Sequence, residues 1–315
     1  MSLDERVAQP LRSVAGLTVV DKPPGLTSHD VVARVRRIAG TRRVGHGGTL
    51  DPMATGVLVI GIGRATRLLT YVSGSDKTYT ATIRLGVTTA SDDADGEQLS
   101  RADASQVTEE QVRAGLAPLT GDIEQVPSSV SAIKVAGKRS YARVRAGEQV
   151  QLKPRPVRVS RFELRELRRP EPDLLDCEVL VTCSAGTYVR ALARDLGAGL
   201  GVGGSLMALR RVDAGVFSLA DAVPLAELED SGRGFLLSLS EAADRLFPRR
   251  DVPETDAARL SHGNPLPAVG MPGPYAVFGP RGVIAVARER DGLARPEVVL
   301  APADLAEAGN PGEGA

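Results

Sequence analysis

Two stretches of the chain alternate between apolar and polar residues, which is the pattern of β-strands that bury one face. The first runs from Lys77 to Val87 and the second from Leu175 to Cys183. Cys177 and Cys183 share the apolar face of the second strand, too far apart for a disulfide and with too few other ligands nearby for zinc. We therefore expect two reduced thiols in a core. The other residues predicted to face inward are Tyr79, Ala81, Ile83, Leu85, Val179 and Val181.

Capping residues mark two helices in the first half of the chain. Thr27 or Ser28 precedes a helical apolar face, and Gly40 follows its last turn. Thr108 and Gln111 have the spacing of a capping box and predict a second helix, which runs towards residue 116. The apolar face of the first helix consists of Val31, Val32, Val35 and Ile38.

A third helix is expected to be capped by Thr187 and to end at Gly197 or Gly199. Its predicted buried face consists of Val189, Leu192, Ala193 and Leu196. Long strands and helices follow one another here without regular alternation. This order favours an α+β domain with a mixed or antiparallel sheet over a doubly wound parallel one.

Composition changes near Arg250, where short apolar segments become punctuated by glycine and proline. We expect a large first domain over 10–249 and a small β-rich domain over 250–305. The strands of the second domain are expected near 275–278 and 283–286. The Gly/Glu-rich tail at 306–315 is expected to be disordered.

The chain has 315 residues, 42% of them hydrophobic, and its formal net charge is zero. These values exclude fibrous and disordered classes. The longest apolar run, from Val57 to Gly63, is far too short to span a membrane, and Asp4 and Glu5 precede any apolar run, unlike a secretory signal. We expect a cytoplasmic protein that does not bind membranes.

Charge is nevertheless segregated along the chain. Residues 1–75 hold ten basic against five acidic side chains, and 132–170 hold twelve against three. The basic segment 132–170 is either a solvated face or a footprint for a phosphate backbone. On the second interpretation Lys134 and Arg143 contact RNA, and the acidic segments face away from it. Those acidic segments are 88–124 and 221–256.

Four glycines surround Asp51 between Gly45 and Gly56. A phosphate cradle is disfavoured because the segment has no P-loop Lys-Ser/Thr pair and Asp51 would repel a phosphate. Two interpretations remain: Asp51 is a nucleophile or base on a rigid loop, or Asp51 and Pro52 merely form a turn. With only three histidines and two cysteines in the chain, we expect no metal site, and nothing indicates an organic cofactor.

Five blocks of the sequence lie at 20–28, 45–52, 77–79, 186–190 and 209–211. Taken together, they resemble the bacterial TruB family of tRNA pseudouridine synthases. They occur in family order, and one departure is Gly47, where many members have threonine. A middle segment with Gln125-Val126-Pro127, then Ser131 to Lys134, is also similar.

The resemblance implies catalytic roles for three residues. Asp51 matches the aspartate that attacks the nucleoside, so that uracil leaves C1′, rotates and rejoins through C5. Tyr79 matches the tyrosine that stacks on the flipped base, and Arg190 the arginine that pairs with the aspartate. A guanidinium near a buried carboxylate lowers its pKa and holds its rotamer, which suits this assignment.

The resemblance also implies residues that bind substrate. Tyr188 and Leu209 match walls of the active site, and His46 matches a histidine that fills the space vacated by the extruded nucleotide. Lys22 and Pro23 match a motif that supports the catalytic loop.

The implied enzyme is a monomer with an extended central sheet, a small C-terminal domain that is similar to PUA domains and touches RNA, and no cofactor. Its implied substrate is uridine 55 in the T-arm stem-loop of tRNA, and no protein partner is needed. A guide-RNA-dependent subunit of the same superfamily is disfavoured because the chain lacks long basic tails. A noncatalytic RNA-folding module would not need Asp51. The mechanistic variants, a C1′ glycal or a C6 adduct, both stay open.

Overall fold

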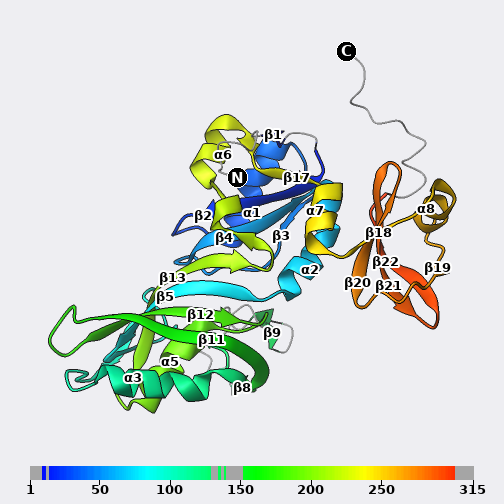
Figure 1. Ribbon diagram of the computed structural model, residues 1–315. Helices are drawn as coiled ribbons and strands as arrows, with labels where there is room; N and C mark the ends of the chain where they lie inside the picture. Colours follow the sequence, from blue (N-terminus) through cyan, green and yellow to red (C-terminus); the bar gives the residue numbers. More distant parts are fainter. Residues whose placement is uncertain (1–8, 12–13, 129–133, 136–137, 140–151, 302–315) are drawn as a thin grey trace.

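The computed structural model describes residues 9–11, 14–128, 134–135, 138–139 and 152–301 (Figure 1). Its main element is an 11-stranded mixed sheet, in which β13 pairs parallel with β4 and β15 pairs parallel with β2, while the other pairs are antiparallel. The α+β prediction with an extended mixed sheet is confirmed. The central order is β15 (Val223–Pro224), β2 (Gly16–Lys22), β4 (Thr55–Ile62), β13 (Gly204–Ala214), β5 (Lys77–Leu85), β12 (Leu175–Cys183), β11 (Arg155–Arg168) and β8 (Gly121–Gln125).

The two alternating stretches form neighbouring strands in the middle of this sheet. β12 buries every odd position, and both cysteines are free thiols in the core, as predicted. β5 ends at Leu85 because Gly86 has a φ of 100°, and Val87 begins the short strand β6 (Val87–Thr89).

Helix α1 (Ser28–Ala39) begins after Thr27, one of the two predicted caps, and α3 (Glu109–Leu116) has the predicted capping box. Thr27 also forms a capping box with Asp30, which was not predicted. Gly40 ends α1 with a φ of 64°. The predicted Thr187 cap of α5 (Val189–Gly199) is wrong, because Tyr188 is the N-cap residue. The Thr187 hydroxyl instead donates to the Ser184 carbonyl at 2.9 Å.

Smaller elements complete this part of the chain, and no helix in the described residues is long and apolar enough to cross a membrane. They are β1 (Gln9–Pro10), β3 (Val44–His46), η2 (Gly63–Leu68), α2 (Leu69–Gly74), β7 (Gln98–Arg101), η3 (Ala117–Leu119), β9 (Lys134–Val135), β10 (Lys138–Arg139), β14 (Phe217–Ser218), η4 (Leu219–Asp221), α6 (Leu225–Ser231), β16 (Arg233–Gly234), β17 (Leu236–Ser238) and α7 (Leu239–Leu246).

A separate five-stranded sheet follows at the C-terminal end, and the two predicted strands lie at its centre (Figure 1). One face of this sheet has a core of its own, which includes Leu260, Tyr275 and Val277, whereas the other face does not. Phe278, Val286 and Leu300 belong to the same buried cluster as Val57 and Val59 of β4. The elements are β18 (Arg249–Asp251), α8 (Glu254–Ser261), β19 (Leu266–Pro267), β20 (Pro274–Gly279), β21 (Gly282–Arg290) and β22 (Leu293–Val299).

Candidate active site

Asp51 lies on the loop between β3 and β4, and buried side chains fix this loop from two sides. Ser28, at the start of α1, accepts a hydrogen bond from the Leu50 amide at 2.8 Å and donates to the Leu50 carbonyl at 3.2 Å. Arg211 of β13 is buried and holds the other side. Its guanidinium donates to the carbonyls of Val57 at 2.7 Å, Gly48 at 3.0 Å and Thr49 at 3.5 Å.

Lys22 joins this loop to the segment that precedes α1. Its side chain is fully buried, and its ammonium donates to the carbonyls of Pro23 at 2.9 Å, Leu26 at 2.6 Å and Pro52 at 3.1 Å. Burial lowers the pKa of Lys22 to about 8, although Asp51 opposes the shift. Three carbonyls use all three donors of the ammonium, so Lys22 supports the loop from beneath.

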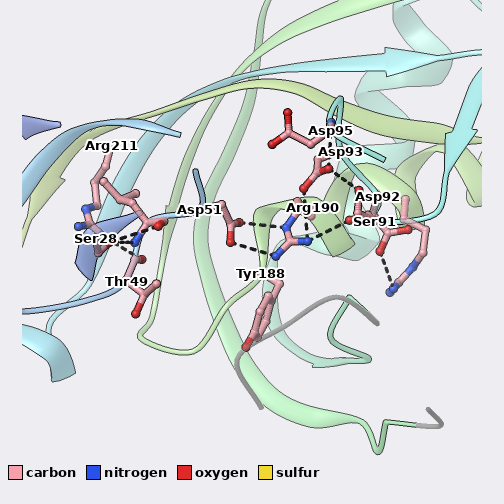
Figure 2. A network of polar contacts seen from close by, with 12 residues as sticks. Ser28, Thr49, Asp51, Ser91, Asp92, Asp93, Asp95, Tyr188, Arg190 and Arg211 are labelled. Atoms are coloured by element: carbon pink, nitrogen blue, oxygen red, sulfur yellow. Dashed lines mark hydrogen bonds and ion pairs between the residues drawn. The ribbon is translucent and has the colours of Figure 1, made fainter. Parts of the chain in front are cut away.

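The Asp51 carboxylate meets the guanidinium of Arg190, which comes from the first turn of α5 (Figure 2). Arg190 Nε lies 3.0 Å from one carboxylate oxygen, and Nη2 donates to the other at 3.1 Å. On its far side, Nη1 lies 3.3 Å from Asp93 and donates to the Ser91 carbonyl at 3.0 Å. Arg190 is therefore a buried cation shared by two carboxylates, of which Asp51 is the more exposed.

The electrostatics of Asp51 differ from the sequence-based expectation. Burial raises its pKa, the Arg190 charge opposes this rise, and Asp93 adds to it. The arginine thus limits the shift without reversing it. The result is a carboxylate that is more basic than an ordinary aspartate and is held in one orientation.

A cavity of about 250 Å³ opens beside this pair. Ligand pockets commonly measure about 300–1,000 Å³, so this one suits a group no larger than a nucleobase with part of its ribose. Asp51, Tyr79, Tyr188, Arg190 and Leu209 all line it, as the sequence predicted. The remaining lining residues are Gly48, Thr49, Leu50, Ser73, Lys77, Ser184, Ala185, Gly186, Thr187, Val189 and Arg211.

Two aromatic residues form much of the wall. Burial raises the pKa of Tyr79, whereas Arg211 lowers it. The backbone of Tyr188 is fixed by the Gln125 amide, which accepts from the Tyr188 N–H at 2.8 Å and donates to its carbonyl at 3.1 Å. Tyr188 thus keeps its place although it begins a helix without a side-chain cap.

The other predicted site residues lie elsewhere. His46 accepts a hydrogen bond from the Gly48 amide at 3.3 Å and stacks edge-on against His29, with ring centres 5.5 Å apart. Burial lowers its pKa. Lys134 lies in the short strand β9, and Arg143 lies outside the described residues.

The charge pattern of the described structure corrects one expectation. The acidic segment 88–124 does not face away as a whole, because Asp93 contacts Arg190 at the site. Local sequence gave no signal for this contact, since Asp93 appeared only as one acid among many.

Along β11, three arginines of the predicted basic footprint form ion pairs with glutamates. Arg161 and Arg165 lie 2.6 and 3.0 Å from Glu163, and Arg168 lies 2.9 Å from Glu166. Pairing reduces the positive charge that this part of the strand offers to a phosphate backbone.

Solved structures with the same fold come from ribonucleoproteins. The archaeal box H/ACA sRNP Nop10-Cbf5 complex contains a chain that is 26% identical, with a TM-score of 0.68 over 92% of this chain and 87% of that one. An H/ACA RNP bound to a substrate RNA containing 2′-deoxyuridine shares the fold at 23% identity and the same TM-score.

Sequence relatives are much more similar. The tRNA pseudouridine synthase B of Arthrobacter sp. (strain FB24) is 52% identical over 302 residues, covering 92% of this chain and 98% of that protein. The enzyme of the same name from Mycolicibacterium paratuberculosis is 53% identical over 294 residues, covering 93% and 100%.

Three family models match consecutive parts of the chain. Residues 36–189 match the N-terminal domain of the TruB family pseudouridylate synthases. Residues 190–234 match a tRNA pseudouridylate synthase B C-terminal domain, and 247–301 match the C terminus of tRNA pseudouridine synthase II. Together with the aspartate–arginine pair beside a base-sized cavity, these matches show that the chain belongs to the TruB family of pseudouridylate synthases.

Proposed function

We propose that this protein isomerises uridine 55 in the T-loop of tRNA to pseudouridine, with Asp51 as the nucleophile. The observation that carries the proposal is the Asp51 carboxylate, held by Arg190 at the wall of a cavity that also contains Tyr79. The activity itself agrees with the name shared by relatives at 52–53% identity.

The chemistry exchanges one bond for another. The glycosidic C1′–N1 bond breaks, uracil rotates and a C1′–C5 bond forms. The C5 proton is released and N1 takes up a proton, so the product is an isomer of the substrate and the reaction is redox-neutral. Flipping the nucleotide costs a few kcal/mol, which a stacking surface such as Tyr79 offsets. Asp51 attacks C1′ or C6, or, on a glycal route, assists loss of uracil while a base removes the C2′ proton.

Around this centre, Tyr188 and Leu209 form walls for the flipped base, and His46 occupies the space that the base leaves. Lys22 acts through the loop that it supports, since its ammonium is buried against carbonyls. Lys134 and Arg143 contact the RNA backbone.

The domain division at residues 249 and 250 belongs to the same proposal, with the C-terminal unit as a PUA-like domain that contacts RNA. The sheet that begins with β18 and the family match to 247–301 support this division.

A protein that needs neither a guide RNA nor a protein partner fits the comparisons better than a subunit of a ribonucleoprotein. Identity is twice as high to the bacterial tRNA enzymes as to the chain of the Nop10-Cbf5 complex. A noncatalytic RNA-folding module would have no use for a carboxylate kept basic beside a cavity. We further propose that the enzyme works as a cytoplasmic monomer.

Asp51→Asn tests the central assignment, because it keeps the size of the side chain and removes the nucleophile. We expect no release of tritium from tRNA labelled at uridine C5, with RNA affinity nearly unchanged. Asp230→Asn, an exposed change on α6, is the matched control and should leave both values at wild type. Turnover of Asp51→Asn at a tenth of wild type would overturn the proposal.

Catalysis without a metal is a second expectation. No group of three His, Cys, Asp or Glu side chains within the described residues is arranged to hold an ion. Enzyme dialysed against EDTA should therefore act on a prefolded stem-loop at the wild-type rate. A divalent-ion requirement that persists with an RNA whose fold needs none would contradict this.

A further inference from the structure

The short helix α2, together with η2 before it, lies between the catalytic loop and the C-terminal unit. Its inner face packs against the loop that leads to Asp51. A Cβ atom added at Gly47 would come within 2.7 Å of Val72, and one at Gly45 within 3.2 Å of Leu69. Helix and loop are therefore in direct van der Waals contact, and a shift of α2 displaces the loop.

The C-terminal end of α2 reaches the substrate cavity through Lys77. The Lys77 ammonium donates to the carbonyls of Val72 at 3.0 Å, Ser73 at 2.7 Å and Ser75 at 2.6 Å. Lys77 and Ser73 both line the cavity, and Lys77 precedes Tyr79 by two residues on β5. Lys77 is also buried, so its charge depends on these three carbonyls.

The outer face of α2 is bound to the C-terminal sheet. The Tyr71 hydroxyl donates to Glu297 of β22 at 3.1 Å, and Glu297 is held in turn by Arg288 at 2.6 Å. The Tyr71 ring packs edge-on against Phe247, with centres 4.7 Å apart.

η2 adds two further contacts to the same strand and its end. Arg64 donates to the Leu300 carbonyl at 3.2 Å, and Arg67 donates to the Val299 carbonyl. Side chains of η2 and α2 thus bind the C-terminal unit, and none of these three side chains lines the cavity.

We propose that the C-terminal unit sets the position of the cavity wall and the catalytic loop through α2, with Tyr71 and Lys77 as positioning residues for the isomerisation step. The inference rests on the proposed function and adds a role for the C-terminal unit besides RNA contact. Misplacement of reacting groups by about 1 Å can cost as much as about a hundredfold in rate, so a contact this far from the chemistry has a measurable effect.

Tyr71→Phe and Glu297→Gln test the link without creating a cavity. The C-terminal unit offers a matched pair, Tyr275→Phe and Glu289→Gln, because the Tyr275 hydroxyl donates to Glu289 at 3.2 Å inside that unit. Single turnovers on a T-arm stem-loop, with enzyme in excess, separate the rate of chemistry from binding. We expect the rate constant to fall by about three- to tenfold for the first pair, within the range that small misplacements produce, with stem-loop affinity unchanged.

The control pair should keep the wild-type rate constant even where it lowers the unfolding temperature. Lys77→Met should be more damaging than Lys77→Arg, because only arginine retains a cation that can donate to the α2 carbonyls. Equal rate constants for the Tyr71, Glu297, Tyr275 and Glu289 variants would overturn the inference.

Hydrogen exchange on the same variants gives a readout that needs no activity. Amides at 47–51 and 71–79 should exchange faster in Tyr71→Phe than in Tyr275→Phe. If wild-type enzyme released no tritium but this difference appeared, the proposed function would fail and the mechanical link would stand. If the wild-type enzyme released tritium but these amides exchanged at the same rate in both variants, the link through α2 would fail and the proposed function would stand.

Discussion

Arg190 shows how one side chain can orient the carboxylate that we propose as the nucleophile. It is buried, and it faces carboxylates on two sides. Two negative groups near one cation hold it in a single rotamer, and the rotamer in turn orients Asp51. A lysine at this position has no planar fork with which to reach both partners, so the substitution is not conservative here.

The two neighbours of Asp51 predict opposite pH shifts. Only the ionised carboxylate is a nucleophile, so the single-turnover rate falls as pH is lowered through the Asp51 pKa, which burial places above the ordinary value of 3.8. Asp93→Asn removes a charge that raises this pKa and should move the acidic limb of the pH–rate profile to lower pH. Arg190→Met removes an opposing charge and should move the limb to higher pH.

Both shifts are measured with enzyme in excess over a prefolded stem-loop, so that slow variants can be followed to completion. Asp230→Asn, remote from the pair, should leave the limb where it is in wild type. Limbs that move in the same direction for Asp93→Asn and Arg190→Met would contradict the electrostatic account.

Tyr79 lines the cavity and has both a ring that can stack on a base and a hydroxyl, and two substitutions separate these properties. Tyr79→Leu should lose a stacking contribution of about 1–3 kcal/mol. On a glycal route the hydroxyl also serves the proton transfer at C2′, so we expect Tyr79→Phe to be nearly as damaging in single turnovers. Full activity of the Phe variant would leave stacking as the only role.

The sequence predicted which residues share the cavity better than it predicted their environment. Asp51, Tyr79 and Arg190 were found through the family blocks, and the structure brings all three to one cavity. Asp93 was missed because its contact with Arg190 joins segments that are distant in the chain, and no local pattern records such a contact. The burial of Asp51 was anticipated, but the sequence predicted a pKa lowered by Arg190, whereas burial outweighs the arginine and raises it.

At the scale of elements, predictions succeeded where the stabilising contacts are local. Capping boxes and alternation depend on residues within a few positions, and α1, α3 and β12 follow them. The α5 cap failed by one residue because the Thr187 hydroxyl bonds to Ser184, and Gln125 from β8 holds Tyr188.

Strand β11 divides into two ends with different electrostatic roles. Arg155, at its beginning, is exposed and has no ion pair with another described residue, whereas the Arg158 guanidinium lies 3.6 Å from Asp122. The Arg158 amide donates to Ser184 Oγ, and Ser184 lines the cavity. Arg168, about 40 Å further along an extended strand, is paired with Glu166. Only the first end is suited to contact phosphates near the site.

This division predicts a difference in salt dependence. Arg155→Ala should weaken stem-loop binding and reduce the slope of log affinity against log salt by about 0.7–0.9, the value for one phosphate contact. Arg168→Ala, the matched control on the same strand, should change neither. Lys134→Ala and Arg143→Ala are expected to behave like Arg155→Ala. If all variants had the same salt slope as wild type, the prediction that these basic residues contact RNA phosphates would be wrong.

At the scale of the whole molecule, the C-terminal unit is less separate than its composition indicates. Glycine and proline marked a change near Arg250, and a separate sheet does begin there. The shared core was not predictable, because the apolar residues of a strand do not specify which partner covers them. Phe278 and Leu300 belong to the same buried cluster as Val57 and Val59 of the main sheet.

Deleting the chain from Arg250 onward should therefore destabilise the catalytic part as well as remove RNA contacts. Each large apolar side chain that loses its cover costs about 1.5–3 kcal/mol, against a total stability of about 5–15 kcal/mol. We expect the truncated protein to unfold at a lower temperature than wild type. At temperatures where it is still folded, it should lose more affinity for whole tRNA than for the stem-loop. Removal of 306–315 alone is the control and should leave unfolding unchanged. A truncated protein that unfolds at the wild-type temperature would mean that the second unit is only an appendage.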